Sequence, residues 1–217
     1  MADSLRQKPP NVLVTGANGF LGSEIVRQVV ATRLAVRVTD KYAGSMTADL
    51  DYRPADILDL SSLNSLFRDV TQVIHVASLS HIFNKTQAVV APFKAINEQG
   101  TANVARAAAI AGVRHFILIS SVSAYGGSRN GGAEDSGCYP QGPYAESKYQ
   151  AEQCAIEIAQ GAGMALTILR LATLYGDGDP GNVARLMRAI AGDVLFGLEM
   201  AQIAKACCIA KMRPGRV

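Results

Sequence analysis

The chain contains a tyrosine and a lysine four residues apart, Tyr144 and Lys148, whose side chains and spacing suit acid–base chemistry. Four residues make about one helical turn, so on a helix the two side chains share a face. A free phenol ionises at about pH 10 and is a poor base near neutrality. A nearby ammonium favours the phenolate, so Lys148 is expected to lower the pKa of Tyr144 and to make it a general base.

A glycine-rich turn near the start of the chain is the second such feature. The segment Thr15 to Gly22 (TGANGFLG) follows an apolar strand predicted at 11–15 and precedes a helix predicted at 20–31. Glycines placed in this way permit a sharp turn, a close approach of backbone to a pyrophosphate, and packing of helix on strand. Asp40 ends the next predicted strand, where its carboxylate would accept both ribose hydroxyls and repel a 2′-phosphate. The pattern predicts NAD rather than NADP, a preference that the neighbouring Lys41 weakens.

Predicted strands and helices alternate along the chain, which indicates right-handed crossovers and a parallel sheet. The expected fold class is α/β, a doubly wound parallel sheet (Rossmann fold) flanked by helices. Further strands are predicted at 35–39, 72–77, 115–120 and 165–170, and further helices at 61–70, 92–111 and 144–163. The expected organisation is a flexible N-terminus at 1–10, an NAD-binding Rossmann domain at 11–190 and an aberrant tail at 191–217.

Composition excludes several classes of protein. With 217 residues, 49% hydrophobic and 18% charged, the chain has the composition of one globular domain. Its net charge of +3 lies at the two ends, so a nucleic-acid partner is not expected. The chain holds no apolar run of about 20 residues, so neither a membrane partner nor a location outside the cytoplasm is expected. The four cysteines, Cys138, Cys154, Cys207 and Cys208, lack metal-ligand spacing and are expected to be reduced, with no metal bound.

Taken together, these motifs resemble the extended short-chain dehydrogenase/reductase family, in particular its NAD-dependent nucleotide-sugar epimerase and dehydratase branch. The resemblance runs from Asn11 to about Ile190. It implies catalytic roles for Ser121, Tyr144 and Lys148: the tyrosine takes a proton from a substrate hydroxyl, the serine hydrogen-bonds that oxygen, and the lysine holds the nicotinamide ribose and lowers the tyrosine pKa. It implies a supporting role for Asn97. The cofactor-binding residues that it implies are Gly16, Gly19, Phe20, Leu21, Gly22, Asp40, Asp56, Ile57, Val76, Ala77, Ser78 and Lys148.

The residues after Ser121 narrow the reaction that the resemblance implies. Sugar dehydratases of this family carry an Asp-Glu pair there, because loss of water needs a further acid and base. Here the two positions are Val122 and Ser123, so dehydration is disfavoured. An epimerase or dehydrogenase acting on a nucleotide sugar is the expected activity. Two alternatives stay open: a reductase of a hydrophobic carbonyl such as a steroid or flavonoid, and a noncatalytic nucleotide-binding product.

The last part of the chain does not fit the resemblance. Relatives continue with a lobe that supplies the sugar pocket, whereas here the resemblance ends near residue 190, so this lobe is expected to be largely missing. Codons can be chosen for the tail segment EMAQIAKACCIAK that, read one base earlier, encode GNGANRKSLLHRQD, a sequence that does resemble the family. We therefore interpret residues from about Ala191 onward as out of frame, with a native amphipathic helix near 200–210 as the alternative. Whether this chain is active or an inactive fragment stays open.

The long helices at 92–111 and 144–163 carry apolar faces. Relatives in the family often dimerise through the two corresponding helices. The resemblance therefore implies a homodimer with a four-helix contact.

Overall fold

The computed structural model describes residues 11–44, 50–80, 90–127, 137–176 and 183. The predicted flexible N-terminus at 1–10 and the predicted aberrant tail at 191–217 lie outside the described residues, as do Cys207 and Cys208. All described residues fall within the domain predicted at 11–190.

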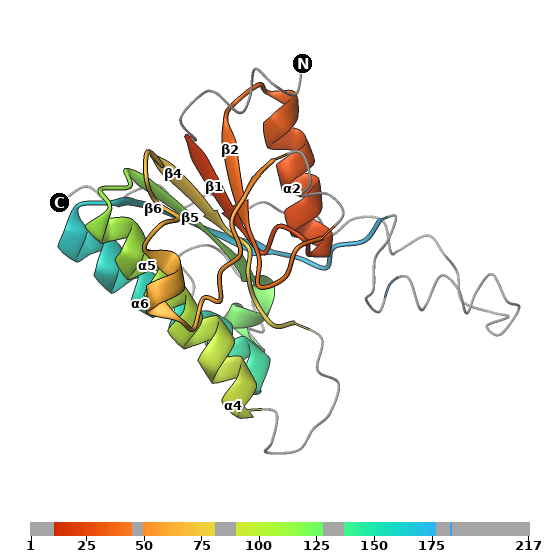
Figure 1. The fold of residues 1–217 in the computed structure, drawn as a ribbon. Coiled ribbons are helices and arrows are strands. Elements are labelled where there is room, and N and C mark those ends of the chain that lie inside the picture. Colours follow the sequence, from red (N-terminus) through yellow and green to blue (C-terminus); the bar gives the residue numbers. More distant parts are fainter. Residues whose placement is uncertain (1–10, 45–49, 81–89, 128–136, 177–182, 184–217) are drawn as a thin grey trace, which may run out of the picture.

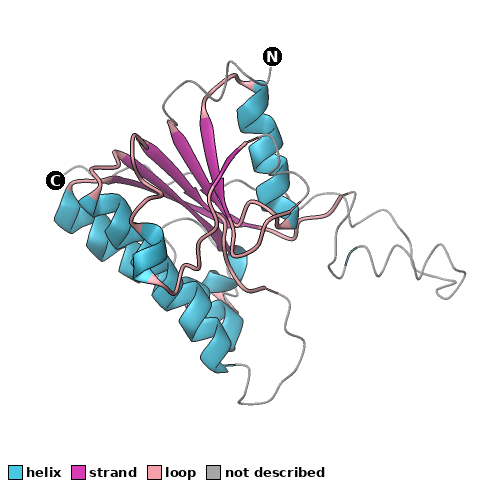
Figure 2. Cartoon of the chain, in the orientation of Figure 1, coloured by secondary structure: helices cyan, strands magenta, loops and turns pink. Residues whose placement is uncertain are grey.

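Six parallel strands form one sheet, drawn as magenta arrows in Figure 2. Their spatial order is β3-β2-β1-β4-β5-β6, and every neighbouring pair runs parallel. This confirms the predicted doubly wound sheet, and the five predicted strands are all present. Only β3 was not predicted, because a two-residue strand is too short to show an apolar pattern. The strands are β1 (Val12–Thr15), β2 (Val36–Thr39), β3 (Asp51–Tyr52), β4 (Gln72–His75), β5 (His115–Ser121) and β6 (Ala165–Leu171).

The helices lie where apolar spacing predicts them, with differences in kind and length. Helix α2 (Phe20–Ala31) has the predicted bounds. The helix predicted at 61–70 is only the short α3 (Leu60–Leu63) followed by turns, since its serines and asparagine compete for backbone hydrogen bonds. The helix predicted at 92–111 is a continuous run of three pieces, the middle one a π-helix. These pieces are α4 (Val90–Phe93), the π-helix η3 (Lys94–Gly100) and α5 (Thr101–Ile110).

Helix α6 (Pro143–Ala162) carries the predicted tyrosine and lysine in its first two turns. Proline at the first position suits a helix start, because its fixed φ is helical and its missing N–H is not needed there. Gly163, with φ of +64°, ends the helix in the left-handed conformation. A short 3₁₀ helix, η4 (Val122–Tyr125), connects β5 to the segment that leads into α6.

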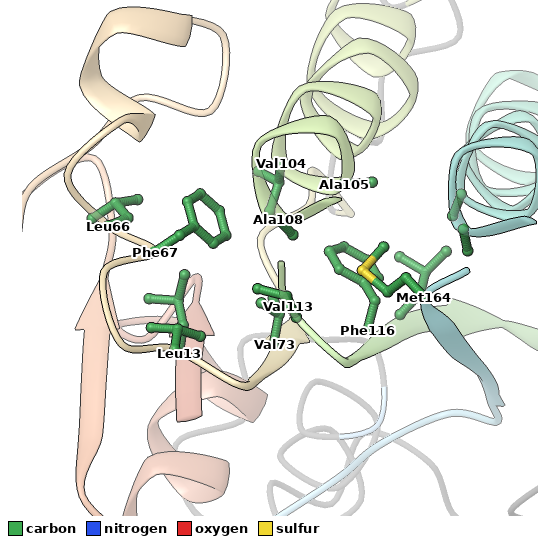
Figure 3. Packing of buried hydrophobic residues seen from close by; sticks show 14 of the residues in the cluster. Leu13, Leu66, Phe67, Val73, Val104, Ala105, Ala108, Val113, Phe116 and Met164 are labelled. Carbon is green, nitrogen blue, oxygen red and sulfur yellow. The ribbon is translucent and has the colours of Figure 1, made fainter. Parts of the chain in front are cut away.

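Side chains of alternate residues in the strands form one apolar core on each face of the sheet. In β1, Val12 and Val14 belong to the core beneath α2, while Leu13 belongs to the core on the opposite face. Figure 1 shows α2 on one side of the sheet and α5 and α6 side by side on the other. The second core includes Leu66, Phe67, Val73, Val104, Ala105, Ala108, Val113, Phe116 and Met164 (Figure 3).

The carboxyl ends of the parallel strands lie along one edge of the sheet. The strand order reverses between β1 and β4, since β2 and β3 follow on one side and β5 and β6 on the other. In open parallel sheets, ligands bind in the crevice at this point. The fold therefore places the candidate site at the ends of β1, β2, β4 and β5, next to the first turns of α2 and α6.

Candidate active site

A cleft of about 940 Å³ lies at this edge of the sheet. It is lined by the ends of β1, β2 and β5, by the loop after β4, and by the first turns of α2 and α6. Every residue predicted for the site lines it, although these residues come from widely separated parts of the chain. They are Gly16, Gly19, Phe20, Leu21, Gly22, Asp40, Asp56, Ile57, Val76, Ala77, Ser78, Ser121, Tyr144 and Lys148.

The glycine turn fits a dinucleotide because side chains would fill the space that the backbone leaves open. A Cβ on Gly16 would lie 2.6 Å from the Ala77 nitrogen, and φ there is +66°, which disfavours other residues. A Cβ on Gly22 would overlap the Gly16 carbonyl oxygen. Helix α2 has no side-chain cap at its start and no acidic residue in its first turn. Its free amides and helix dipole suit a pyrophosphate.

Carboxylates lie at the adenosine end of the cleft. Asp40 accepts hydrogen bonds from the Asn18 amide at 3.0 Å and from the Lys41 amide at 2.8 Å, which fixes its carboxylate beside the turn. The Lys41 ammonium forms an ion pair with Asp56, with 2.9 Å between Nζ and Oδ2. The Leu58 amide and Lys41 together hold the pKa of Asp56 below its usual value. The cation that was expected to weaken the NAD preference is thus paired with a carboxylate.

Ser121 and Tyr144 meet at the other end of the cleft. Burial raises the pKa of Tyr144 above its usual value, and a hydrogen bond with Ser121 opposes that shift. Lys148 is not among the causes of this shift, so its predicted lowering of the tyrosine pKa stays a prediction. The Phe93 ring packs edge-on against the phenol, with 5.7 Å between ring centroids.

Lys148 is almost fully buried, with 3% of its surface exposed. Its Nζ donates a hydrogen bond to the Ile119 carbonyl at 2.6 Å, which anchors it to β5. Burial lowers the pKa of Lys148 to about 8, while the Glu152 carboxylate acts in the opposite direction. The lysine is therefore mostly protonated at neutral pH, but its pKa is low enough for it to lose the proton in mildly alkaline solution.

Asn97 ties three parts of the site together, in agreement with its predicted supporting role. From the π-helix, its side chain accepts from the Leu79 amide at 2.7 Å and donates to the Leu79 carbonyl at 3.0 Å. It also donates to Ser147 Oγ at 2.9 Å, and Ser147 donates to the Tyr144 carbonyl at 2.8 Å. The loop after β4 and the first turn of α6 are thereby held in one arrangement.

A buried ion pair behind the cleft was missed from the sequence. Glu152 is fully buried and binds Arg170 of β6 through two nitrogens, the shorter contact being 2.6 Å. Ser120 also donates to Glu152, and the guanidinium lies 4.4 Å from the centre of the Tyr125 ring. The one available signal was the position of Glu152, a helical turn after Lys148 on an otherwise apolar face.

His75, the last residue of β4, also supports the site. It lies between the hydroxyls of Thr15 at 2.7 Å and Thr101 at 3.1 Å. Burial, and secondarily the charge of Lys148, lower the pKa of His75 to about 3, so it stays neutral. Thr15 in turn accepts from the amides of Val76 and Ala77, which places the loop after β4 against the glycine turn.

Val122 and Ser123 line the cleft directly beside Ser121. Neither can act as the acid or base that a dehydratase needs there. Other lining residues that the sequence did not single out are Ser80, Ile96, Ile119, Leu171, Thr173 and Leu174.

Three general features of the described residues bear on the site. No group of three or more His, Cys, Asp or Glu among them is arranged to hold a metal ion. Cys138 and Cys154 are free thiols. In the part of the chain that the structure covers, no helix has the length and apolar character needed to cross a membrane.

Comparison with known proteins agrees with this geometry. The model of the family described as "NAD dependent epimerase/dehydratase family" matches residues 12–203. A UDP-glucose 4-epimerase of Vibrio cholerae is 29% identical over 191 residues, covering 86% of this chain and 58% of that protein. A vaccinia virus 3β-hydroxysteroid dehydrogenase/Δ5→4-isomerase is 29% identical over 184 residues, covering 76% of this chain and 53% of that protein.

Solved structures show the same fold. The UDP-glucuronic acid 4-epimerase of Bacillus cereus, in complex with UDP-glucuronic acid and NAD, superimposes with a TM-score of 0.75 and 25% identity. The match covers 84% of this chain and 63% of that one. The chain thus spans little more than half the length of these relatives. The family match confirms the resemblance, including the predicted NAD-dependent class of enzyme and its cofactor: the chain belongs to the NAD-dependent epimerase/dehydratase family.

Proposed function

We propose that this chain carries the cofactor site and the catalytic residues of an NAD-dependent epimerase that acts on a nucleotide sugar. One observation supports this above all: the glycine turn, Asp40, and the group of Ser121, Tyr144 and Lys148 line a single cleft. The vacant helix amides receive the pyrophosphate, and Asp40 accepts the adenosine ribose. The Vibrio and Bacillus relatives, named as 4-epimerases of UDP-sugars, support the substrate class.

In the proposed reaction, NAD accepts a hydride from the sugar carbon and later returns it to the opposite face. Tyr144, as phenolate, takes the proton from the hydroxyl on that carbon and gives it back afterwards. Ser121 donates a hydrogen bond to the same oxygen. Lys148 binds the nicotinamide ribose, and its ammonium favours the phenolate once both groups contact the same ribose. Val122 and Ser123, in place of an acid–base pair, favour oxidation and reduction over loss of water.

A second candidate is reduction of a hydrophobic carbonyl, which the steroid dehydrogenase relative of vaccinia virus supports. The same tyrosine, serine and lysine serve that reaction. The residues that line the cleft also include the apolar Ile96, Ile119, Leu171 and Leu174. The two candidates differ in whether the cofactor is regenerated within one catalytic cycle.

The test uses the purified chain and its Tyr144→Phe variant. Calorimetry is expected to show both binding NAD more tightly than NADP. Proton NMR is expected to show that the parent chain, but not the variant, interconverts UDP-glucose and UDP-galactose, or UDP-glucuronic and UDP-galacturonic acid, without net reduction of NAD. Oxidation of a steroid with stoichiometric reduction of NAD would favour the second candidate. NAD binding with turnover of neither substrate class would favour a noncatalytic product.

We further propose that the chain forms a homodimer through the paired helices α5 and α6. These helices lie side by side on one face of the sheet, and Ile110 at the end of α5 is 88% exposed (Figure 1). Sedimentation equilibrium is expected to give twice the chain mass. A monomer at micromolar concentration would contradict this part of the proposal.

A further inference from the structure

The hydrogen bonds around Ser121 determine where its own proton points. Ser121 Oγ accepts from the Ser123 hydroxyl at 2.9 Å and from the Ser123 amide at 3.2 Å. A serine hydroxyl has two lone pairs and one proton. Because Ser123 supplies both donors, the proton of Ser121 is left for its remaining partner, the phenol of Tyr144.

We propose that Ser123 is a positioning residue that makes Ser121 a hydrogen-bond donor, and not an acceptor, toward Tyr144 in the free chain and toward the substrate oxygen once substrate is bound. The inference rests on the proposed function. A phenol that receives a hydrogen bond from Ser121 does not give its own proton to the same oxygen, so this arrangement favours the phenolate. Ser123 thus supports the base form of Tyr144 without touching the reacting atoms.

Charged groups near Tyr144 do not replace this effect in the chain alone. Burial raises the pKa of Tyr144, and the hydrogen bond with Ser121 is the described influence that lowers it. None of the titratable groups on the elements packed around α6 is among the causes of the shift. These groups include Lys148 and Glu152 on α6 itself, Lys94 and Glu98 on η3, Arg106 on α5, His115 on β5, Tyr125 on η4 and Arg170 on β6.

Variants at positions 122 and 123 separate the effect of the Ser123 hydroxyl from a purely structural role of the same turn. Ser121 caps η4 by accepting from the Ser123 amide, and that bond persists whatever side chain stands at position 123. Ser123→Ala removes only the hydroxyl and keeps the cap. Ser123→Thr keeps both the hydroxyl and the cap of η4. Val122→Ala truncates the neighbouring side chain on the same 3₁₀ helix and is the matched control.

The experiment follows the ionisation of Tyr144 directly. The chain is produced with 3-fluorotyrosine, whose phenol is more acidic than that of tyrosine, and titrated by ¹⁹F NMR. Of the seven tyrosine signals, that of Tyr144 is identified by its loss in Tyr144→Phe. Ser123→Ala is expected to raise its titration midpoint by about one pH unit, a tenfold loss of phenolate at a given pH. Ser123→Thr and Val122→Ala are expected to leave the midpoint within a few tenths of a unit.

Ser121→Ala separates this inference from the proposed function. If Ser121→Ala raises the Tyr144 midpoint but Ser123→Ala does not, the role of Ser123 is overturned and that of Ser121 stands. If Ser121→Ala leaves the midpoint unchanged, the pairing of Ser121 with Tyr144 in the proposed function fails as well. Should Ser123→Ala not fold, Ser123→Val replaces it, because valine matches the shape of the threonine control and has no hydroxyl. An unchanged midpoint in that variant overturns the inference equally.

Discussion

The two ends of the cleft differ in how far their charged groups are exposed to solvent. At the cofactor end, the turn from Gly16 to Gly22 leaves space by lacking side chains, and the charged groups Lys41 and Asp56 are substantially exposed. At the catalytic end, the charged groups are buried: Lys148 is 3% exposed and Glu152 is fully buried. Charges in water contribute little to stability, whereas buried charges depend strongly on their partners. Substitutions of the exposed charged groups at the first end should therefore have little effect on stability, whereas those of the buried charged groups at the second should change both chemistry and stability.

The largest effect is expected at the catalytic end. Tyr144→Phe should lower the rate of nucleotide-sugar turnover by about 10³-fold, because the proposed general base is lost while the ring packing against Phe93 remains. NAD affinity should change less than about threefold, since the cofactor end is untouched. Rates by NMR and affinities by calorimetry measure the two quantities. A variant that keeps more than a tenth of the parent rate would rule out Tyr144 as the base.

The next largest effect is expected on the free energy of unfolding, which should fall more for a variant at the catalytic end than for one at the cofactor end. Glu152→Ala should lower the free energy of unfolding by about 3–5 kcal/mol, because Arg170 is left buried without a counter-charge. Asp56→Asn, which breaks the exposed pair with Lys41, should cost less than about 1 kcal/mol. Urea denaturation measures both. Equal losses in the two variants would contradict the distinction drawn between the two ends.

The buried lysine should make stability depend on pH in a defined direction. The pKa of Lys148 falls from 10.5 in the unfolded chain to about 8 in the folded one, so between these values the unfolded state holds the extra proton. This group therefore makes the free energy of unfolding rise from pH 8 to 10.5, by about 3 kcal/mol in total.

Comparison with Lys148→Met isolates that contribution, because Tyr144 and the other titrating groups are common to both proteins. The parent should gain stability relative to the variant as the pH rises from 8 to 10. Urea titrations at several pH values measure the difference. A difference that stays constant with pH would show that burial does not lower the lysine pKa.

The smallest effect is expected at the adenosine end. Asp40→Asn should weaken NAD binding about tenfold and reduce discrimination against NADP, because the repulsion of a 2′-phosphate is removed. Lys41→Met should leave NAD affinity nearly unchanged, since this lysine is paired with Asp56. Calorimetry with both cofactors measures the ratio. A parent chain that binds NADP as tightly as NAD would refute the role given to Asp40.

The same contrast explains what could be predicted from the sequence. One short stretch of the sequence contains the glycine turn, helix α2 and Asp40. Its geometry can be predicted from the spacing of its residues, and the structure places them as expected. Tyr144 and Lys148 were found because a helical turn brings them to one face. The alternation of strands and helices then sufficed to bring all the predicted residues to one cleft.

Contacts between distant residues could not be predicted in the same way. The partner of Lys148 is the carbonyl of Ile119, 29 residues away in the sequence. Every residue has a backbone carbonyl, so the sequence does not indicate which one accepts this hydrogen bond. The pairing of Glu152 with Arg170 likewise depends on how closely α6 packs on β6. The π-helix around Asn97 has no local pattern that distinguishes it from an ordinary helix. Burial and the Glu152 carboxylate set the pKa of Lys148. Both depend on how the elements pack, so the electrostatics of the site could not be predicted from the sequence alone.

The most direct test of the central claim is to mix the NAD-saturated chain with a UDP-sugar and follow the near-ultraviolet absorbance of the reduced nicotinamide within a single turnover. The claim that Tyr144 removes a proton as hydride leaves the same carbon predicts a transient rise in the parent chain and none in Tyr144→Phe, with equal NAD occupancy in both. A rise of equal size in Tyr144→Phe, or none in a parent chain shown to hold both NAD and the sugar, would contradict it.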